Sequence, residues 1–152
     1  DCMDESIFDR QLDEQLCFRL YRASNGINKM YGRALKIFQL TFPQYLVLLA
    51  LWDNDGLPIM TIGSQTGMGI GTLNPILKRM AENEWIEKSQ HPTDKRTMLI
   101  SLSAKAKESK QPINQAILAE MISCNFEGMD LPELMLQLAN LQQRLDTINE
   151  NK

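Results

Sequence analysis

The apolar pattern of the chain changes near residue 84 from the period of a helix to that of a strand, and this change limits the folds available to it. Up to that point, "GTLNPILKRM" spaces its apolar residues as an α-helix does. These residues are Leu73, Ile76, Leu77 and Met80. Beyond it, "WIEKSQ" and "RTMLISLS" alternate apolar and polar residues on either side of "HPTD", which has the composition of a turn. The sequence therefore predicts a helix at residues 71–84, followed directly by a β-hairpin at residues 85–102.

Three helices are predicted before this pair. Apolar residues recur at helical spacing across residues 12–35. The segment "LTFPQYLVLLALWDNDG" follows, with Thr41 near the cap, Pro43 in the first turn and Gly56 after the end, and "PIMTIGSQTG" fits a short helix. Two short helices joined by a glycine-containing turn form a helix-turn-helix, and the hairpin after them adds a wing. Residues 41–103 are thus expected to form a winged helix-turn-helix core.

The turn between the two short helices contains "TGMGIG", in which Gly67, Gly69 and Gly71 alternate with other residues. Glycines before a helix can hold a phosphate, but this spacing matches neither the P-loop nor the dinucleotide-binding fingerprint. We therefore expect a backbone role. The glycines turn the chain sharply and let the helix at residues 71–84 pack close to its predecessor.

Long helices are predicted after the hairpin. Ser103 opens a helical segment in which Pro112 is expected to cause a kink or a break. Asp130 and Glu133 have the spacing of a capping box and open the last helix. The apolar residues of that helix alternate in steps of three and four, the pattern of a helix that packs on another helix. They are Leu131, Leu134, Leu138, Leu141, Leu145 and Ile148. The expected fold is mainly α with a small β-hairpin wing, in one domain spanning residues 1–152.

Composition excludes several classes of protein. The three cysteines are widely spaced and His91 is the single histidine, so neither a disulfide framework nor a site of several histidines is expected. We expect no metal, no cofactor and no enzymatic activity. No apolar run reaches membrane-spanning length, and the acidic N-terminus lacks the features of a signal peptide. A cytoplasmic protein with no membrane partner is expected.

The net charge is −3, but the charges are unevenly distributed. Residues 1–70 carry 6 basic and 8 acidic side chains, residues 71–110 carry 8 and 5, and residues 111–152 carry 2 and 6. The net-positive part therefore begins with the helix at residues 71–84, and local sign matters more than the total for attracting a polyanion. By themselves, Lys78 and Arg79 also fit a solvated helix face, and the hairpin behind them favours DNA.

Four segments resemble the MarR family of winged-helix regulators, and within it the OhrR-type sensors of organic hydroperoxides: "QLCFRLYRASNGINKMYGRAL", "LTFPQYLVLLALWDNDGL", "GTLNPILKRM" and "DKRTMLISLS". The resemblance is nearly continuous over residues 12–103 and weaker beyond. It implies a homodimer formed by the N- and C-terminal helices, here about residues 8–36 and 104–152. It also implies that each subunit places a recognition helix in a major groove of palindromic double-stranded DNA, with half-sites about 34 Å apart.

The resemblance places specific side chains at the DNA. On the recognition helix, the outward residues are Thr72, Asn74, Lys78 and Arg79. Asn can pair with adenine, Thr can touch a thymine methyl, and Lys or Arg serve guanine or phosphate. The wing spans residues 91–96, in which Asp94 and Arg96 flank Lys95 in a D-x-R pattern. In the family, the Arg of this pattern enters the minor groove.

Cys17 is the redox sensor that the resemblance implies. A thiol reacts with a peroxide as its thiolate, and phenol hydroxyls stabilise that anion by hydrogen bonding. Tyr21 and Tyr31 share a helical face with Cys17, and in the family the matching tyrosines reach the cysteine from the other subunit. From spacing alone, a small buried cysteine with packing tyrosines is the alternative interpretation.

Cys124 lies about where some relatives carry a resolving cysteine, which forms an intersubunit disulfide after the sensor is oxidised. The alternative for Cys124 is a core position on one helical face with Ile117 and Met121. Cys2, near the chain terminus, is interpreted as incidental.

Two positions depart from the relatives. Phe42 stands where some relatives carry a third tyrosine, which removes one possible hydroxyl donor to the oxidised sulfur. Gly69-Ile70 replaces Asp-Ser before the recognition helix, which removes a polar contact near the start of that helix.

The resemblance favours a transcriptional repressor that releases its operator when Cys17 is oxidised by an organic hydroperoxide or a related oxidant. Three alternatives stay open. The first is a regulator of the same fold switched by a small aromatic ligand in the dimer-interface cleft, with Cys17 passive. The second is a thiol-dependent peroxidase, which would turn over repeatedly with a reductant. The third is a dimeric module that has lost DNA binding.

Overall fold

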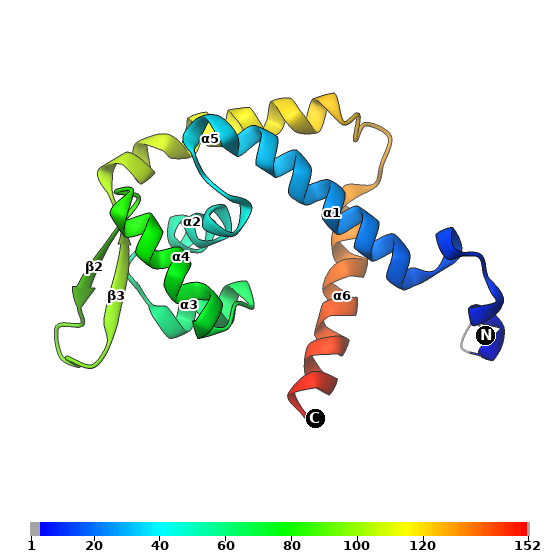
Figure 1. Cartoon of the computed structure of the whole chain (residues 1–152), viewed down its shortest axis with the longest axis horizontal. Helices are drawn as coiled ribbons and strands as arrows, with labels where there is room; N and C mark the ends of the chain where they lie inside the picture. The colour runs from blue at the N-terminus through cyan, green and yellow to red at the C-terminus, as the bar shows by residue number, and fades with distance from the viewer. Residues whose placement is uncertain (1–3, 152) are drawn as a thin grey trace. The chain divides into compact units, whose positions relative to one another are not determined.

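Helices make up most of the computed structural model, which describes residues 4–151. A small three-stranded antiparallel sheet completes the fold, so the class expected from the sequence is confirmed. The elements are α1 (Leu16–Leu35), α2 (Phe42–Asp53), β1 (Leu57–Pro58), α3 (Ile59–Thr66), α4 (Ile70–Glu82), β2 (Ile86–Gln90), β3 (Met98–Leu102), α5 (Ala104–Ser123) and α6 (Leu131–Glu150) (Figure 1). Short 3-10 helices lie at Glu5–Asp9, Leu12–Glu14 and Lys36–Phe38. Cys2 lies outside the described residues.

The chain divides into two compact units, Asp1–Glu120 and Met121–Lys152. Helix α2 is the centre of the first unit because it is apolar on nearly every side. Val47, Leu48 and Leu51 are fully buried, and α2 contacts α1, α3, α4 and β3. Thr41 caps the helix, as predicted, and a capping box with Gln44 begins it. The Thr41 hydroxyl accepts from the Gln44 amide at 3.3 Å, and Gln44 Oε1 accepts from the Thr41 amide at 3.1 Å.

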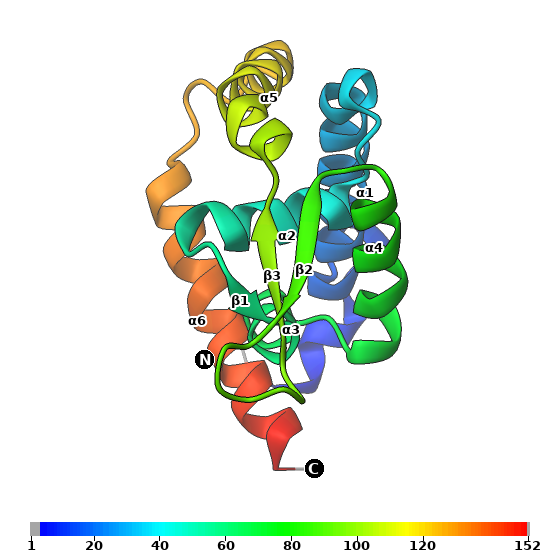
Figure 2. The same ribbon diagram turned by 90° about the vertical axis from the view of Figure 1, so that its left-hand side faces the viewer.

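Strand β3 lies between β1 and β2 in the sheet (Figure 2). Strands β2 and β3 form the predicted hairpin, with Lys88 opposite Ile100. Strand β1 is an addition that the sequence analysis missed, and its Leu57 pairs with Ile100 from the other side. A two-residue strand is too short to display alternation, and Pro58 argues against a strand except at a sheet edge, where it lies here.

Helix α1 begins at Leu16, so the start predicted at residue 12 is wrong by one turn. Gln15 has extended backbone angles and separates α1 from the 3-10 helix Leu12–Glu14. Met30, Ala34 and Leu35 at the C-terminal end are buried, whereas the earlier apolar residues are exposed. These are Leu16, Leu20 and Ile27. The N-terminal part of α1 therefore presents an apolar face to solvent in the single chain.

Helix α5 runs without a break from Ala104 to Ser123, so a break at Pro112 is wrong. Pro112 removes one backbone hydrogen bond, the one that would reach the Glu108 carbonyl. Both residues are exposed, so water can satisfy that carbonyl. Ile113 is fully buried directly after the proline and holds the helix against the core.

Helix α6 belongs to the second unit. The Asp130 carboxylate accepts a hydrogen bond from the Glu133 amide at 3.1 Å, which confirms the Asp130 part of the predicted capping box. None of the helix residues is buried. Leu134, Leu138 and Leu145, which belong to the predicted apolar seam, are 42%, 40% and 51% exposed. With Ile148 at 55%, four of the six predicted seam residues are therefore exposed in the single chain.

Within residues 4–151, no single helix has both the length and the apolar character needed to cross a membrane. The segments Leu16–Phe38 and Phe42–Asp53 meet that test only as a pair, which is bent by 78° at its break.

The end of α4 holds a residue other than glycine in the left-handed conformation. The predicted helix ran to residue 84, but α4 ends at Glu82 and Glu84 has a φ of 62°. The Trp85 amide donates to the Met80 carbonyl at 2.9 Å, and the Glu84 amide donates to the Ala81 carbonyl at 3.1 Å. This is the Schellman arrangement, in which glycine is preferred at the position of Glu84 because a side chain there costs about 1 kcal/mol.

Replacing Glu84 with glycine should therefore raise the free energy of unfolding by about 0.5–1 kcal/mol, because glycine adopts a positive φ without steric cost. Denaturant unfolding of wild type and variant measures the change. Glu82→Gly is the matched control inside the helix and should lower the free energy of unfolding by about 0.5–1 kcal/mol. A Glu84→Gly variant less stable than wild type would contradict this account of the helix end.

Candidate functional site

Helices α3 and α4 meet at a tight turn that depends on two glycines. Gly67 has a φ of 78°, and its amide donates to the Gly63 carbonyl at 2.9 Å. A Cβ atom on Gly63 would lie 3.0 Å from the Met68 carbonyl oxygen, whereas one on Gly69 or Gly71 would meet nothing within 4 Å. The predicted turning role is confirmed for Gly67. Close packing depends on Gly63, which was not predicted because the approach of the Met68 carbonyl depends on the conformation of the turn.

Helix α4 turns its polar side chains outward, as predicted. Leu73, Leu77 and Met80 are fully buried, and the four candidate reading residues are exposed. They are Thr72, Asn74, Lys78 and Arg79. Gly69 is the N-cap and makes no side-chain hydrogen bond, so the first turn of α4 lacks a side-chain cap.

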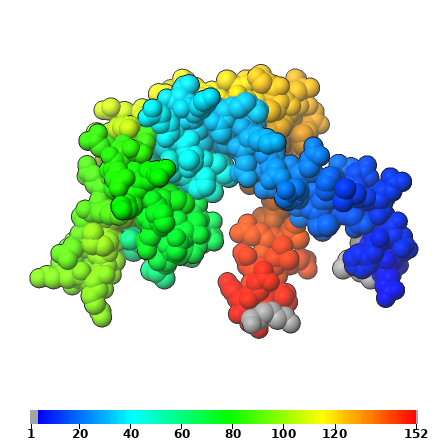
Figure 3. Space-filling view, viewed as in Figure 1, coloured from blue at the N-terminus to red at the C-terminus, as the bar shows by residue number. Residues whose placement is uncertain are grey.

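The wing is the loop between β2 and β3, and it projects beside the helix-turn-helix (Figure 3). His91 Nδ1 accepts hydrogen bonds from the amides of Thr93 and Asp94, both at 3.2 Å. Asp94 Oδ1 accepts from the Arg96 amide at 3.1 Å and from Arg96 Nε at 3.4 Å. The Thr97 hydroxyl donates to Asp94 Oδ2 at 3.0 Å. His91 is the first residue of the turn, and its ring holds the backbone of the next residues in place. This role was not predicted from the sequence.

The charges of the wing tip favour an anionic partner. The Arg96 side chain is 93% exposed although its Nε contacts Asp94, and Lys95 between them is exposed. The Arg96 amide, and after it the Thr97 hydroxyl, hold the pKa of the Asp94 carboxyl below its usual value. Asp94 thus stays ionised and orients Arg96, and the tip presents two cations to solvent.

Cys17 and Tyr21 lie on the uncovered part of α1. Cys17 is exposed, and Tyr21 is 64% exposed, so a buried packing role for Cys17 does not hold in the single chain. Tyr31 follows Cys17 by 14 residues, about 21 Å along the helix at 1.5 Å per residue. The structure therefore places Cys17 and Tyr21 on one surface but keeps Tyr31 away from the Cys17 of its own chain.

Tyr31 instead belongs to an aromatic cluster with α2. Its ring centroid lies 5.0 Å from that of Phe42 and 5.4 Å from that of Tyr45. Tyr45 in turn meets Trp52 edge-on at 6.1 Å. Burial, and to a smaller degree Tyr31, raise the pKa of Tyr45. Phe42, where some relatives carry a tyrosine, is thus the direct neighbour of Tyr31.

Cys124 follows the last residue of α5. Its side chain is exposed, although Ile117 earlier on the helix is buried. The core interpretation of Cys124 is therefore wrong for the single chain. Across residues 4–151, no three His, Cys, Asp or Glu side chains gather in a way that could hold a metal ion.

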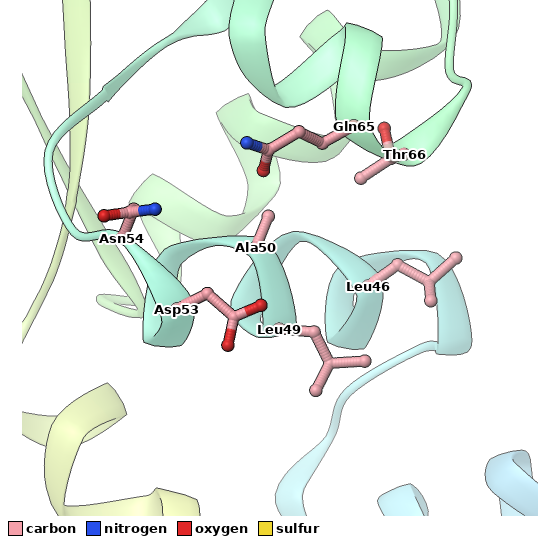
Figure 4. A pocket seen from close by; sticks show the side chains of 7 residues that line it. All are labelled: Leu46, Leu49, Ala50, Asp53, Asn54, Gln65 and Thr66. Atoms are coloured by element: carbon pink, nitrogen blue, oxygen red, sulfur yellow. The ribbon is translucent and has the colours of Figure 1, made fainter.

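An open hollow of about 490 Å³ lies between α2 and α3 (Figure 4). Leucine side chains of α2 form one part of its lining, and the Gln65 amide and the Asp53 carboxylate form another. The lining residues are Leu46, Leu49, Ala50, Asp53, Asn54, Gln65 and Thr66.

Comparison with known proteins identifies the family of this fold. The model of the MarR family matches residues 40–98. The organic hydroperoxide resistance transcriptional regulator of Bacillus subtilis strain 168 is 37% identical over 149 residues, which are 95% of this chain and 99% of the relative. This chain belongs to the MarR family. It is a transcriptional regulator by family, and the regulator SarZ of Staphylococcus saprophyticus is 34% identical over 87% of this chain and 92% of its own length.

Solved structures of AbfR, a protein of Staphylococcus epidermidis, are also similar to this MarR-family chain. Reduced AbfR bound to DNA has a TM-score of 0.80 at 31% identity and covers 90% of this chain and 94% of AbfR. Overoxidised AbfR bound to DNA has a TM-score of 0.76 with the same identity and coverage. The disulfide form of AbfR has a TM-score of 0.67 at 30% identity and covers 88% of this chain and 91% of AbfR.

Tyr45→Phe should make the MarR-family chain less sensitive to alkali. Because burial raises the pKa of Tyr45 above 10.0, the neutral phenol contributes stability below pH 10 that is lost as the pH rises through the raised pKa. Denaturant unfolding between about pH 8 and about pH 11 should show a steeper loss in wild type than in the variant. Parallel losses would contradict the burial of this phenol.

Proposed function

We propose that this MarR-family regulator is a redox-sensing repressor. Its homodimer binds palindromic DNA while Cys17 is reduced and releases the DNA after an organic hydroperoxide oxidises Cys17. The proposal is carried by the exposure of Cys17 and Tyr21 on the uncovered apolar part of α1. A reactive thiol needs an accessible surface, and an exposed apolar helix face needs a partner. Both requirements meet at this one place.

The partner is a second copy of the chain. Apolar residues in the N-terminal part of α1 and most of the seam of α6 are exposed in the single chain, and pairing them in a dimer removes them from water. We assign residues 8–36 and 104–152 to the dimer and residues 41–103 to DNA binding, within one domain of residues 1–152. Because Tyr31 lies about 21 Å from its own Cys17, the phenol that completes the site is Tyr31 of the partner subunit.

The oxidation has two steps. The Cys17 thiolate attacks one hydroperoxide oxygen, an S–O bond forms as the O–O bond breaks, and the alcohol leaves with a proton. The Cys124 thiol of the partner subunit then attacks the sulfenic sulfur, a disulfide forms and water leaves. Overoxidised AbfR is bound to DNA, which supports the disulfide, rather than oxygenation of the cysteine alone, as the step that releases DNA.

Helix α4 and the wing contact the DNA in this proposal. Asn74 and Thr72 read base edges in the major groove, and Lys78 and Arg79 contact guanine or phosphate. Arg96 enters the minor groove, oriented by Asp94, and Lys95 adds positive charge at the backbone. The DNA-bound structure of reduced AbfR, at 31% identity, supports this placement.

The alternative is a regulator of the same fold that is switched by a small aromatic ligand in the dimer-interface cleft, with Cys17 passive. The alternative predicts that a Cys17→Ser variant still responds to its signal.

One equivalent of an organic hydroperoxide should release the wild-type dimer from a palindromic duplex, and Cys17→Ser should stay bound. Cys124→Ser should also stay bound, because its oxidised Cys17 has no partner thiol. Fluorescence anisotropy measures release, and non-reducing electrophoresis measures the disulfide. Release of the Cys17→Ser variant would contradict the redox switch, and release of Cys124→Ser would contradict the disulfide step only.

Asn74→Ala should weaken binding to the preferred operator by about 1–3 kcal/mol and relax the base preference at one position of each half-site. Lys78→Ala is the matched control on the same helix. It should weaken all duplexes about equally and reduce the salt dependence of the affinity by about one counterion per subunit. Competition binding over single-base operator variants tests the pair, and an unchanged preference in Asn74→Ala would contradict base reading by Asn74.

A further inference from the structure

The chain that leaves the recognition helix α4 lies against Ser103, which precedes α5, and Lys105 in its first turn, and these two residues donate hydrogen bonds to three consecutive carbonyl groups. The Asn83 carbonyl accepts from Lys105 Nζ at 3.0 Å. The Glu84 carbonyl accepts from the Ser103 hydroxyl at 2.7 Å, and the Trp85 carbonyl accepts from the Ser103 amide at 3.1 Å. These carbonyls lie just beyond Glu82, the last residue of α4, so the donors at Ser103 and Lys105 bind the chain where it leaves the recognition helix.

We call residues 102–107 the junction segment. This segment also binds Trp52 in α2 and Asp55 in the turn that follows α2. Asp55 Oδ1 accepts from the Leu102 amide at 2.8 Å, and Lys107 Nζ lies 3.9 Å from Asp55 Oδ2. Trp52 Nε1 donates to the Ala106 carbonyl at 3.2 Å. Leu102 is the last residue of β3. The root of the wing, the end of α4 and the end of α2 are therefore all bound at the start of α5.

Ser103 is the buried centre of this junction segment, with 8% of its surface exposed. Its hydroxyl donates to the Glu84 carbonyl and accepts from the Ala106 amide at 3.1 Å. The second bond caps α5. The first holds a residue whose φ of 62° is unfavourable for a side chain and persists only where the surroundings fix it.

We propose that Ser103 is a positioning residue for DNA recognition, which fixes the end of α4 to α5 so that the recognition helix and the wing root move with α5. This inference rests on the proposed function, in which α5 belongs to the dimerisation helices and DNA is released after oxidation; a bond from α5 to the end of α4 then couples the dimer to the DNA-binding surface. The bond from the Ser103 hydroxyl to the Glu84 carbonyl is part-buried, so it contributes more than a fully exposed contact. The exposed Lys105 contact contributes less.

Substitutions at Ser103 separate the bond to α4 from the cap of α5. Ser103→Thr keeps both functions of the hydroxyl. Ser103→Asp keeps an acceptor for the Ala106 amide but cannot donate to the Glu84 carbonyl, and Ser103→Ala removes both. Lys105→Met keeps an apolar stem near the Trp85 ring, whose centroid lies 4.2 Å from the ammonium, and removes the donor to Asn83. This last variant is surface-exposed and serves if a carboxylate at position 103 prevents folding.

Amide hydrogen exchange in the DNA-free dimer is the first readout. The Trp85 amide should exchange about five- to tenfold faster in Ser103→Asp and Ser103→Ala than in wild type and Ser103→Thr. The Ala106 amide should stay protected in Ser103→Asp and lose protection in Ser103→Ala. Lys105→Met should accelerate exchange at Trp85 about twofold. Wild-type exchange at Trp85 in Ser103→Asp, or in both Ser103→Ala and Lys105→Met, would overturn the proposal.

Binding to palindromes whose half-sites are one base pair closer or farther apart is the second readout. Wild type and Ser103→Thr should prefer one spacing, and loss of the bond to α4 should reduce this preference about fivefold. A protein that is merely less stable would lose affinity equally at all spacings. An unchanged preference in Ser103→Asp would overturn the proposal. Failure of wild type to bind any duplex would overturn the proposed function instead, and hydrogen exchange would still decide the role of Ser103.

Discussion

The architecture depends on the burial of α2, a helix that is apolar on nearly every side. Val47, Leu48 and Leu51 are removed from water completely, and each such side chain contributes about 1.5–3 kcal/mol. A helix of this kind must be surrounded, and α1, α3, α4 and β3 all contact it. The recognition helix and the wing therefore rest on one core. The inward residues of the recognition helix and the wing pack on α2 and its neighbours, so their outward residues are free to contact a binding partner.

This core ends before the N-terminal part of α1, and α6 has no buried residue of its own. The apolar residues left exposed there are the physical reason to expect a second copy of the chain. They also explain the position of the proposed sensor. A thiol at a subunit boundary is accessible to a small peroxide, can be completed by groups from two chains, and changes the contact between them when it is oxidised. Away from the dimer surface, the Ser103 hydroxyl joins the start of α5 to the chain that follows α4.

Regular patterns in the sequence predicted most of the fold, and the misses have no regular pattern in the sequence. The cap at Thr41, the hairpin and the buried face of α4 follow from local spacing. The strand at Leu57 depends on its partner Ile100, and the need for glycine at position 63 depends on the Met68 carbonyl. For the site, the outward residues of α4 follow from helical period. The separation of Tyr31 from Cys17 follows from helix length. The packing of Tyr31 against Phe42 and Tyr45 depends on how α1 and α2 meet, which the sequence does not predict.

The most direct test of the account is the oxidation rate of Cys17 in a mixed dimer of one Cys17→Ser subunit and one Tyr31→Phe subunit. The remaining Cys17 belongs to the Tyr31→Phe chain and faces an intact Tyr31 of the partner subunit. If Tyr31 acts across the dimer, this thiol should react with an organic hydroperoxide at the wild-type rate. Thiols in the Tyr31→Phe homodimer should react more slowly. A mixed-dimer rate equal to that of the Tyr31→Phe homodimer would contradict a site shared between subunits.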